Sequence, residues 1–161
     1  MKKNLLTKEY YDKITKAAEL ELSASSLYKH LCNQLQGIGY FGSAEYFKKE
    51  SADELIHYQV WADFVNDRGS ALMIPTVKGF TDKVTSLKDA FEMFYKKEYD
   101  LGEFYNEWYL ECEDAAIHQQ LISFVEIQRK SIGEAGDFLA TLEMCGNEKG
   151  ALLLFDKEIN D

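Results

Sequence analysis

Pro75 is the only proline in the 161 residues of this sequence. Because proline lacks a backbone N–H and breaks a helix from within, a chain with almost none of it can form long, uninterrupted helices. Apolar residues make up 46% of the sequence and recur every three or four positions through most of it, which is the period of a helix with one buried face. The sequence therefore predicts an all-α fold, and its length suits one domain with its own core.

Capping residues and glycines divide the chain into five predicted helices. Thr7 is a suitable N-cap for the first, Ser43 for the second, and Ser86-Leu87-Lys88-Asp89 is a capping box before the third. The break before the fourth carries neither glycine nor proline. It is inferred because the apolar stripes on either side of it would lie on opposite faces of one continuous helix. The predicted helices cover approximately residues 7–36, 43–69, 86–113, 116–145 and 150–159.

The lengths of the connecting segments predict the topology. The first and second helices share a short connection, as do the third and fourth, so each pair is expected to form an antiparallel hairpin. Residues 70–85 form a longer connection, which can span roughly 50 Å when extended, whereas a bundle helix of about 27 residues is roughly 40 Å long. The sequence thus favours a ferritin-like four-helix bundle with one long crossover between helices two and three and a short C-terminal fifth helix.

Charge and cysteine content exclude several classes of partner and location. The net charge is -10, and no run of Lys or Arg is present that could grip a phosphate backbone, so no nucleic acid is expected as a partner. No window approaches the ~20 apolar residues of a membrane span, and the N-terminus lacks the apolar core of a signal peptide. The cysteines at 32, 112 and 145 are odd in number and widely spaced, which is typical of reduced core thiols in a cytoplasmic protein.

Glutamates occupy the predicted inward faces of three helices. Glu21 lies on the first, Glu54 on the second and Glu98 on the third, each among apolar neighbours at helical spacing. Glutamate is almost never fully buried unless paired, and an ionised carboxylate in an apolar interior is costly. Either these side chains are protonated or a cation lies among them. Because no inward Arg or Lys stands out on these stripes, a metal ion is the simpler interpretation.

Glu54 and His57 form the surest candidate pair of metal ligands. A Glu-x-x-His spacing places a carboxylate and an imidazole on one helical face about one turn apart, so both can reach one ion. A donor set rich in carboxylates with one imidazole suits Fe or Mn better than a structural zinc site. One such motif is common by chance. The hypothesis therefore depends on Glu21, Glu98 and Gln128, which lie near the middle of the other three stripes.

The other candidates also have simpler structural explanations. Glu19 lies two positions from Glu21, so only one of the two can face inward, and Glu21 alone could be a solvated helix residue. Glu98 alone could form a surface ion pair with a neighbouring lysine. Gln128 alone could satisfy a buried backbone group, and Tyr28 could serve only in core packing.

Several segments together resemble the bacterial non-haem ferritins over nearly the whole chain. The segments that carry the resemblance are Leu20–Tyr28, Ala52–His57, Lys97–Tyr99, Phe124–Gln128 and Gly150–Ile159. The last of them resembles the short fifth helix that lines the fourfold contacts of ferritin cages. Bacterioferritins and rubrerythrins carry a second Glu-x-x-His on the fourth helix, where this chain has Gln128 and Ser131.

The resemblance implies an iron storage protein with ferroxidase activity and two Fe per subunit. It implies Fe(II) and O2 or H2O2 as substrates, a mineral core, and self-assembly into a homo-24-mer. In that family the residue matching Glu54 bridges two irons, the one matching His57 ligates one, and the one matching Gln128 lies by the second. The implied metal ligands are Glu21, Glu54, His57, Glu98 and Gln128. Tyr28 would be a catalytic residue that hydrogen-bonds to a ligand or donates an electron.

Two departures and two alternatives accompany this resemblance. The resemblance leaves open whether the third iron position of bacterial ferritins exists here, because Asp53 matches it whereas Ile127, Lys130 and Ser131 depart from it. The acidic entry channel of animal ferritins is matched by His118 and Leu121, which leaves the iron entry route open. The alternatives are a rubrerythrin-like di-iron peroxidase or oxidase without storage, and a non-catalytic helical scaffold whose inward glutamates are protonated.

Overall fold

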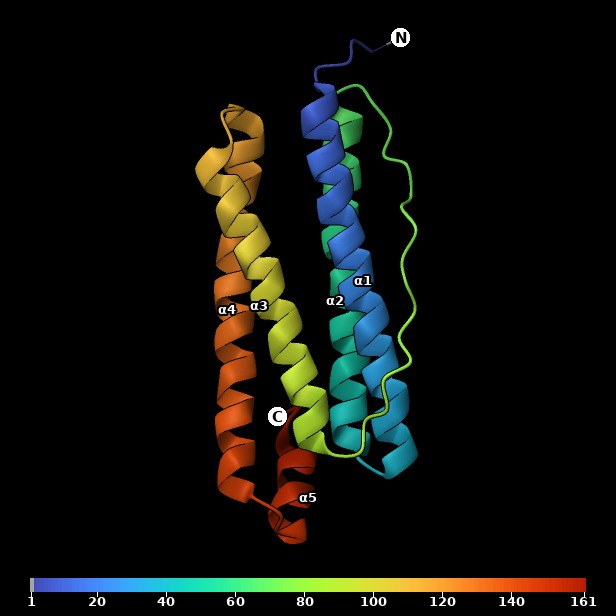
Figure 1. The fold of residues 1–161 in the computed structure, drawn as a ribbon, viewed down its shortest axis with the longest axis vertical. Coiled ribbons are helices and arrows are strands. Elements are labelled where there is room, and N and C mark those ends of the chain that lie inside the picture. The colour runs from blue at the N-terminus through green and yellow to red at the C-terminus, as the bar shows by residue number, and fades with distance from the viewer. Residues whose placement is uncertain (1) are drawn as a thin grey trace. The chain divides into compact units, whose positions relative to one another are not determined.

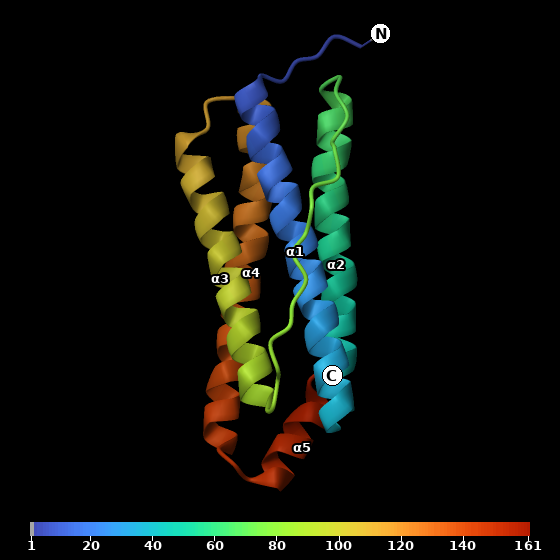
Figure 2. The same cartoon turned by 45° about the vertical axis from the view of Figure 1, so that its right-hand side comes forward.

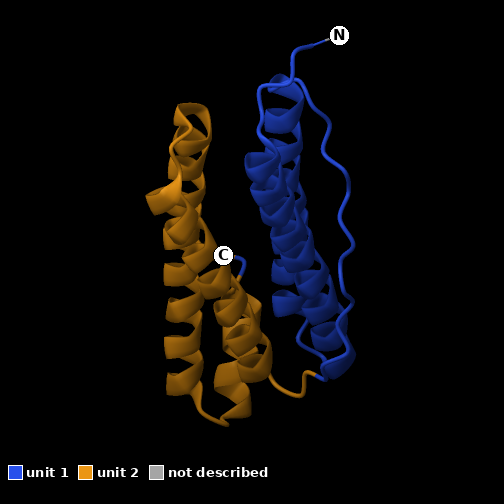
Figure 3. Cartoon of the chain, turned by 45° about the horizontal axis from the view of Figure 1, so that its top comes forward, with its two compact units in different colours: residues 1–83, 160 blue, residues 84–159, 161 orange. Residues whose placement is uncertain are grey.

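The computed structural model describes residues 2–161, and over that range the chain forms five α-helices and no β-strand (Figure 1). The prediction of an all-α chain with a short C-terminal helix is confirmed. The helices are α1 (Lys8–Ile38), α2 (Phe41–Asp67), α3 (Leu87–Glu111), α4 (Ala115–Cys145) and α5 (Lys149–Glu158). The chain divides into two compact units, residues up to 83 with residue 160, and residues 84–159 with residue 161 (Figure 3).

The first unit is built on the antiparallel hairpin of α1 and α2 (Figure 2). Thr7 caps α1 as predicted, since its side chain accepts a hydrogen bond from the backbone N–H of Tyr10 at 3.2 Å. Gly39 ends α1 with a φ of 93°, a left-handed conformation that glycine adopts without strain. One further residue, Tyr40, then leads directly into α2.

The predicted start of α2 at Ser43 was wrong. The helix begins at Phe41, two residues earlier, and its N-cap Tyr40 makes no side-chain capping hydrogen bond. Ser43 is instead fully buried within α2. The glycines around this turn suggested a longer break, but the left-handed Gly39 reverses the chain without help from Gly42, which lies inside the helix.

The segment after α2 runs back along the length of α1 (Figure 1 and Figure 2). Near the start of α1, the hydroxyl of Tyr11 donates to the carbonyl of Ala71 at 2.9 Å. Near the end of α1, His30 Nε2 donates to the carbonyl of Asp82 at 2.6 Å, and its ring stacks on Phe80. The predicted long connection is therefore present, and it carries the chain from one end of the α1–α2 hairpin to the other.

The second unit contains the hairpin of α3 and α4. Ser86 caps α3 by accepting from the N–H of Asp89 at 3.1 Å. The turn between the helices occupies residues 112–114, which overlaps the turn predicted near residues 113–116 but begins one residue earlier. Asp114 is the N-cap of α4, because its carboxylate accepts from the N–H groups of Ala116 and Ile117, each at 3.0 Å.

Helix α5 is held to this second hairpin by an aromatic cluster. The ring of Phe155 lies 5.4 Å from Phe91 of α3 and 5.9 Å from Phe138 of α4, in edge-to-face geometry. Leu153 and Leu154 of α5 are 58% and 53% exposed. One face of the short helix is therefore anchored, while two leucines remain in solvent.

Two further expectations concern the cysteines and the membrane. In the described part of the chain all three cysteines are free thiols, as predicted, but each is only partly buried and none belongs to the core. No helix among residues 2–161 combines the length and the apolar character that crossing a membrane requires.

Candidate metal centre

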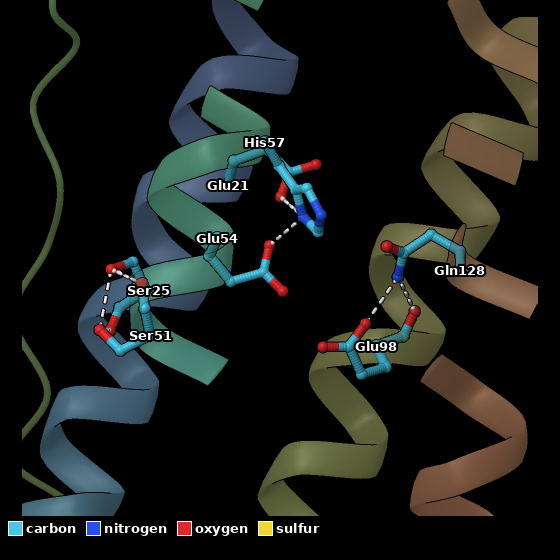
Figure 4. Close-up of polar contacts among 7 residues, drawn as sticks. All are labelled: Glu21, Ser25, Ser51, Glu54, His57, Glu98 and Gln128. Atoms are coloured by element: carbon cyan, nitrogen blue, oxygen red, sulfur yellow. Dashed lines mark hydrogen bonds and ion pairs between the residues drawn. The ribbon is translucent and has the colours of Figure 1, made fainter. Parts of the chain in front are cut away.

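Three predicted ligands come together in the first unit. Glu21 of α1 and Glu54 and His57 of α2 turn their side chains toward one another (Figure 4). His57 Nδ1 lies 2.9 Å from an oxygen of Glu54 and 3.6 Å from an oxygen of Glu21. The Glu54-x-x-His57 spacing places both α2 residues on the face that contacts α1, as the helical period requires.

This group is buried and strongly polar. Glu21 is fully buried, Glu54 is 3% exposed, and the His57 side chain is 19% exposed. Burial by itself lowers the pKa of His57, but the close ion pair with Glu21, the hydrogen bond with Glu54 and the negative charges of both outweigh it and raise the pKa to about 10. In the metal-free protein His57 is therefore an imidazolium that serves as an internal counterion. Its single charge can balance only one of the two carboxylates.

The donor atoms of this group fit a hard metal ion. One oxygen from each glutamate and one ring nitrogen of His57 all lie within 4.8 Å of one another. Among the described residues, this is the only group of three or more His, Cys, Asp or Glu side chains arranged in this way. Two carboxylates with one imidazole match the donors that iron and manganese accept. The predicted pairing of Glu-x-x-His with a glutamate of the first helix is therefore present in the structure.

Two predicted ligands come together in the second unit. The side-chain amide of Gln128 on α4 donates to the carboxylate of Glu98 on α3 at 2.7 Å and to the Glu98 backbone carbonyl at 3.2 Å (Figure 4). Glu98 is fully buried and Gln128 is 1% exposed. Because the carboxylate fixes the amide N–H groups, the amide oxygen points away from it, and this oxygen has no hydrogen-bond partner among the described residues. A buried oxygen in this state is suited to bind a cation.

The simpler explanations offered by the sequence are only partly correct. Glu19 pairs with Lys16 at the surface at 3.2 Å, which leaves Glu21 as the inward glutamate. Glu98 was expected to be able to pair with a neighbouring lysine at the surface, but Glu98 is buried, and Lys96 pairs instead with Asp100 at 2.6 Å on the exposed side of α3. Gln128 does satisfy a backbone carbonyl, as the alternative suggested, but it also binds the Glu98 carboxylate.

Tyr28 lies in the core of the first unit. It is fully buried on α1, seven residues after Glu21, and its ring centroid is 6.0 Å from that of Phe47 on α2. Seven residues correspond to about two helical turns, so Tyr28 shares the face of α1 that carries Glu21. Core packing accounts for this ring, and its catalytic role stays a prediction.

The residues that the resemblance aligns with a third iron position or with an entry channel lie in other environments. Asp53 is exposed on α2. Lys130 is exposed on α4, and its ammonium group lies 3.6 Å from the carboxylate of Glu126. The same carboxylate also pairs with Arg129 at 2.8 Å. His118, at the start of α4, stacks on Tyr109 with ring centroids 4.2 Å apart. The contacts of Lys130 and His118 are therefore with surface neighbours and not with the two ligand groups.

A pair of buried serines beside the first ligand group was not predicted. The hydroxyl of Ser25 on α1 donates to the backbone carbonyl of Ser51 on α2 at 2.8 Å, and the hydroxyl of Ser51 donates to the carbonyl of Ser25 at 2.9 Å (Figure 4). Ser25 lies four residues after Glu21, so it shares the inward face that the sequence predicted for the first helix. The pairing itself depends on the register between two helices, which neither helix's own periodicity reveals.

Comparisons with known proteins agree with this architecture. A family model described as a ferritin-like domain matches residues 11–145. The bacterial non-heme ferritin of Escherichia coli O6:H1 is 24% identical over 159 residues, covering 97% of this chain and 96% of that protein. A probable bacterial non-heme ferritin-like protein of Haemophilus influenzae is 25% identical over 145 residues, covering 88% of each chain.

The solved structures extend the agreement to the fold. An open pore ferritin from the archaeon Archaeoglobus fulgidus superposes with a TM-score of 0.92 at 24% sequence identity, and the match covers 98% of both chains. This likeness confirms the predicted ferritin-like fold with its long crossover and short fifth helix. Because the family model spans most of the sequence and the relatives match it nearly end to end, this chain belongs to the ferritin family.

Proposed function

We propose that this protein stores iron and has ferroxidase activity, oxidising Fe(II) to Fe(III) with O2 or H2O2 at a di-iron site and retaining the product as mineral inside a cage. The observation that carries the proposal is the buried group of Glu21, Glu54 and His57. Two carboxylates at this depth need positive charge, and the imidazolium of His57 supplies only part of it. Membership of the ferritin family supports iron as the cation.

The two ligand groups are proposed to serve the same pair of irons. Glu54 bridges the irons, Glu21 and His57 complete the ligands of the first, and Glu98 and Gln128 bind the second. The free amide oxygen of Gln128 supports its place in this set. With a neutral amide where other family members have a second Glu-x-x-His, the second iron has weaker ligands. A weaker site suits iron that is passed onward after oxidation.

This ligand set favours the oxidised product. Two Fe(II) ions together supply the two electrons that reduce one O2 to H2O2, or one H2O2 to two molecules of water. Each iron gains one positive charge in the process, and the carboxylates of Glu21, Glu54 and Glu98 stabilise that added charge electrostatically. Tyr28 either hydrogen-bonds to a ligand or donates an electron, and its position on the Glu21 face of α1 supports both roles.

The proposed storage function also includes a closed assembly of about 24 identical subunits in the cytoplasm. The exposed Leu153 and Leu154 of α5 support it, because a short helix anchored on one face leaves these side chains available for contacts between copies. The free cysteines support a reducing compartment.

Replacing Glu54 tests the site. Glu54→Ala removes the proposed bridge, so rapid Fe(II) oxidation, followed by stopped-flow absorbance after mixing with aerated buffer, is expected to disappear. Glu45→Ala is the matched control, because it makes the same change on α2 at an exposed position that pairs only loosely with Lys48 at 3.8 Å. It should oxidise iron at the wild-type rate. Wild-type oxidation by a folded Glu54→Ala variant would exclude this site assignment.

Glu98→Ala tests whether both ligand groups serve one centre. If they do, this variant also loses the rapid phase, and its anaerobic Fe(II) titration saturates at fewer ions per subunit than the wild type. If Glu98→Ala instead keeps wild-type kinetics and stoichiometry while Glu54→Ala does not, the second unit contributes no ligand and the di-iron assignment is wrong.

A further inference from the structure

The backbones of α1 and α2 approach each other closely at Ser25 and Ser51. Each hydroxyl donates to the backbone carbonyl of the other residue, at 2.8 and 2.9 Å, and the two hydroxyl oxygens are 3.0 Å apart. Ser25 is 2% exposed and Ser51 is fully buried. Direct contact between a side chain and the facing main chain requires a small residue on both helices, since the spacing of packed helices depends on the side chains at the contact. We call this pair the serine clamp.

The serine clamp lies one helical turn from two of the proposed metal ligands. Ser25 follows Glu21 by four residues on α1, and Ser51 precedes Glu54 by three residues on α2, so the separations along each helix are about 6 and 4.5 Å. Residues at these spacings share one face of a helix. The clamp therefore fixes the separation and register of the two backbones immediately beside the place where their carboxylates meet.

We propose that Ser25 and Ser51 are positioning residues for the metal site, an inference that rests on the proposed function. They act through Glu21 and Glu54 and do not touch the metal. The clamp sets the distance between the two carboxylates, and through Glu54 it sets their distance from His57. Metal coordination tolerates deviations of only about 0.2 Å in ligand distance. A small change in helix separation at the clamp would therefore reach the site as misplaced ligands.

The clamp also explains why hydroxyls are present at these two buried positions. A hydroxyl buried without a hydrogen bond is costly, and an alanine would fill nearly the same space with no polar atom. The reciprocal arrangement uses each hydroxyl hydrogen on a carbonyl of the opposite helix, so it resists both sliding and separation of the two backbones. A role confined to core filling would not require bonds that run in both directions between the helices.

Metal affinity and stability can be measured separately to test this proposal. The variants are Ser25→Ala, Ser51→Ala and the double variant, with Ser43→Ala as control. Ser43 is also fully buried on α2, but it lies eleven residues before Glu54, which is about 16 Å along the helix. Co(II) is the probe because, unlike Fe(II), it is not oxidised by air during a titration. Its visible absorption bands also report the number and geometry of the metal ligands. Affinity is measured by Co(II) titration and stability by thermal unfolding of the metal-free protein.

The double variant is expected to bind Co(II) about 10–100-fold more weakly than the wild type with shifted absorption bands, as is typical when groups that orient metal ligands are removed. The single variants should fall in between, which keeps the test usable if the double variant unfolds. Ser43→Ala should keep wild-type affinity and bands even where it lowers thermal stability. If the clamp variants lose stability but keep wild-type affinity and spectrum, the clamp is only core packing. Failure of the wild type itself to bind Co(II) would instead overturn the proposed function.

Discussion

At the scale of single residues, His57 changes the interpretation of the buried carboxylates. The sequence offered no inward Lys or Arg, and a metal ion seemed necessary to balance Glu21 and Glu54. The contacts of His57 with the two carboxylates raise its pKa to about 10, so a protonated His57 accounts for part of that balance in the metal-free protein. Periodicity could place these three residues on facing stripes, but the charge of the histidine depends on contacts of 2.9 and 3.6 Å that only the folded chain defines.

The charge state of His57 is a direct prediction for the metal-free protein. Its pKa of about 10 lies above the ordinary value of 6.5, so its contribution to stability is fully present below about pH 6.5 and is lost as the pH rises through 10. An NMR titration of the imidazole should show this midpoint. Glu54→Gln should lower it, because the charge and one strong hydrogen-bond acceptor are removed. A midpoint near 6.5 in the wild type would contradict the geometry of this ligand group.

At the scale of the helices, the sequence correctly predicted features that depend only on residues close together along the chain, such as the caps of α1 and α3. The caps at Thr7 and Ser86 are formed as expected, since a capping hydrogen bond joins residues three positions apart. The start of α2 was missed because one left-handed glycine, Gly39, completes the turn. The contact of Ser25 with Ser51 was missed because it depends on the register between two helices.

Two glycines that end helices give a matched test of the packing around the first unit. Gly39 and Gly69 both have positive φ, 93° and 84°. A Cβ at Gly39 would meet nothing within 4 Å, whereas one at Gly69 would overlap the backbone carbonyl of Lys3. Gly39→Ala should therefore lower the free energy of unfolding by about 1–2 kcal/mol from the left-handed conformation alone. Gly69→Ala should lower it by about 1–3 kcal/mol more.

The measurement is urea denaturation of the metal-free protein, followed by helical circular dichroism. The extra loss at Gly69 arises from the N-terminal segment, which is tied to the end of α2 by a hydrogen bond from the N–H of Leu5 to the carbonyl of Arg68 at 2.8 Å. Equal losses in the two variants would show that this segment does not press on Gly69 in solution.

At the scale of the whole molecule, the fold predicted from the sequence agrees with the fold of the ferritin family. The proposed chemistry depends on which ligand side chains that fold brings together. Three proposed ligands meet in the first unit and two in the second. The ferritin family model and the likeness to the Archaeoglobus fulgidus ferritin extend over both units. The proposed assembly relies on exposed side chains such as Leu153 and Leu154, and periodicity carries no information on which partner covers an exposed side chain.

Iron loading of the intact protein tests the central claim most directly. Fe(II) is added anaerobically, air is admitted, and the particle mass and the iron content per subunit are measured. The proposed function predicts a particle of about 24 subunits that holds many more than two irons per subunit. Two irons per subunit in a small oligomer would contradict storage and indicate a di-iron peroxidase or oxidase. No bound iron at all would contradict the metal site itself and indicate a helical scaffold.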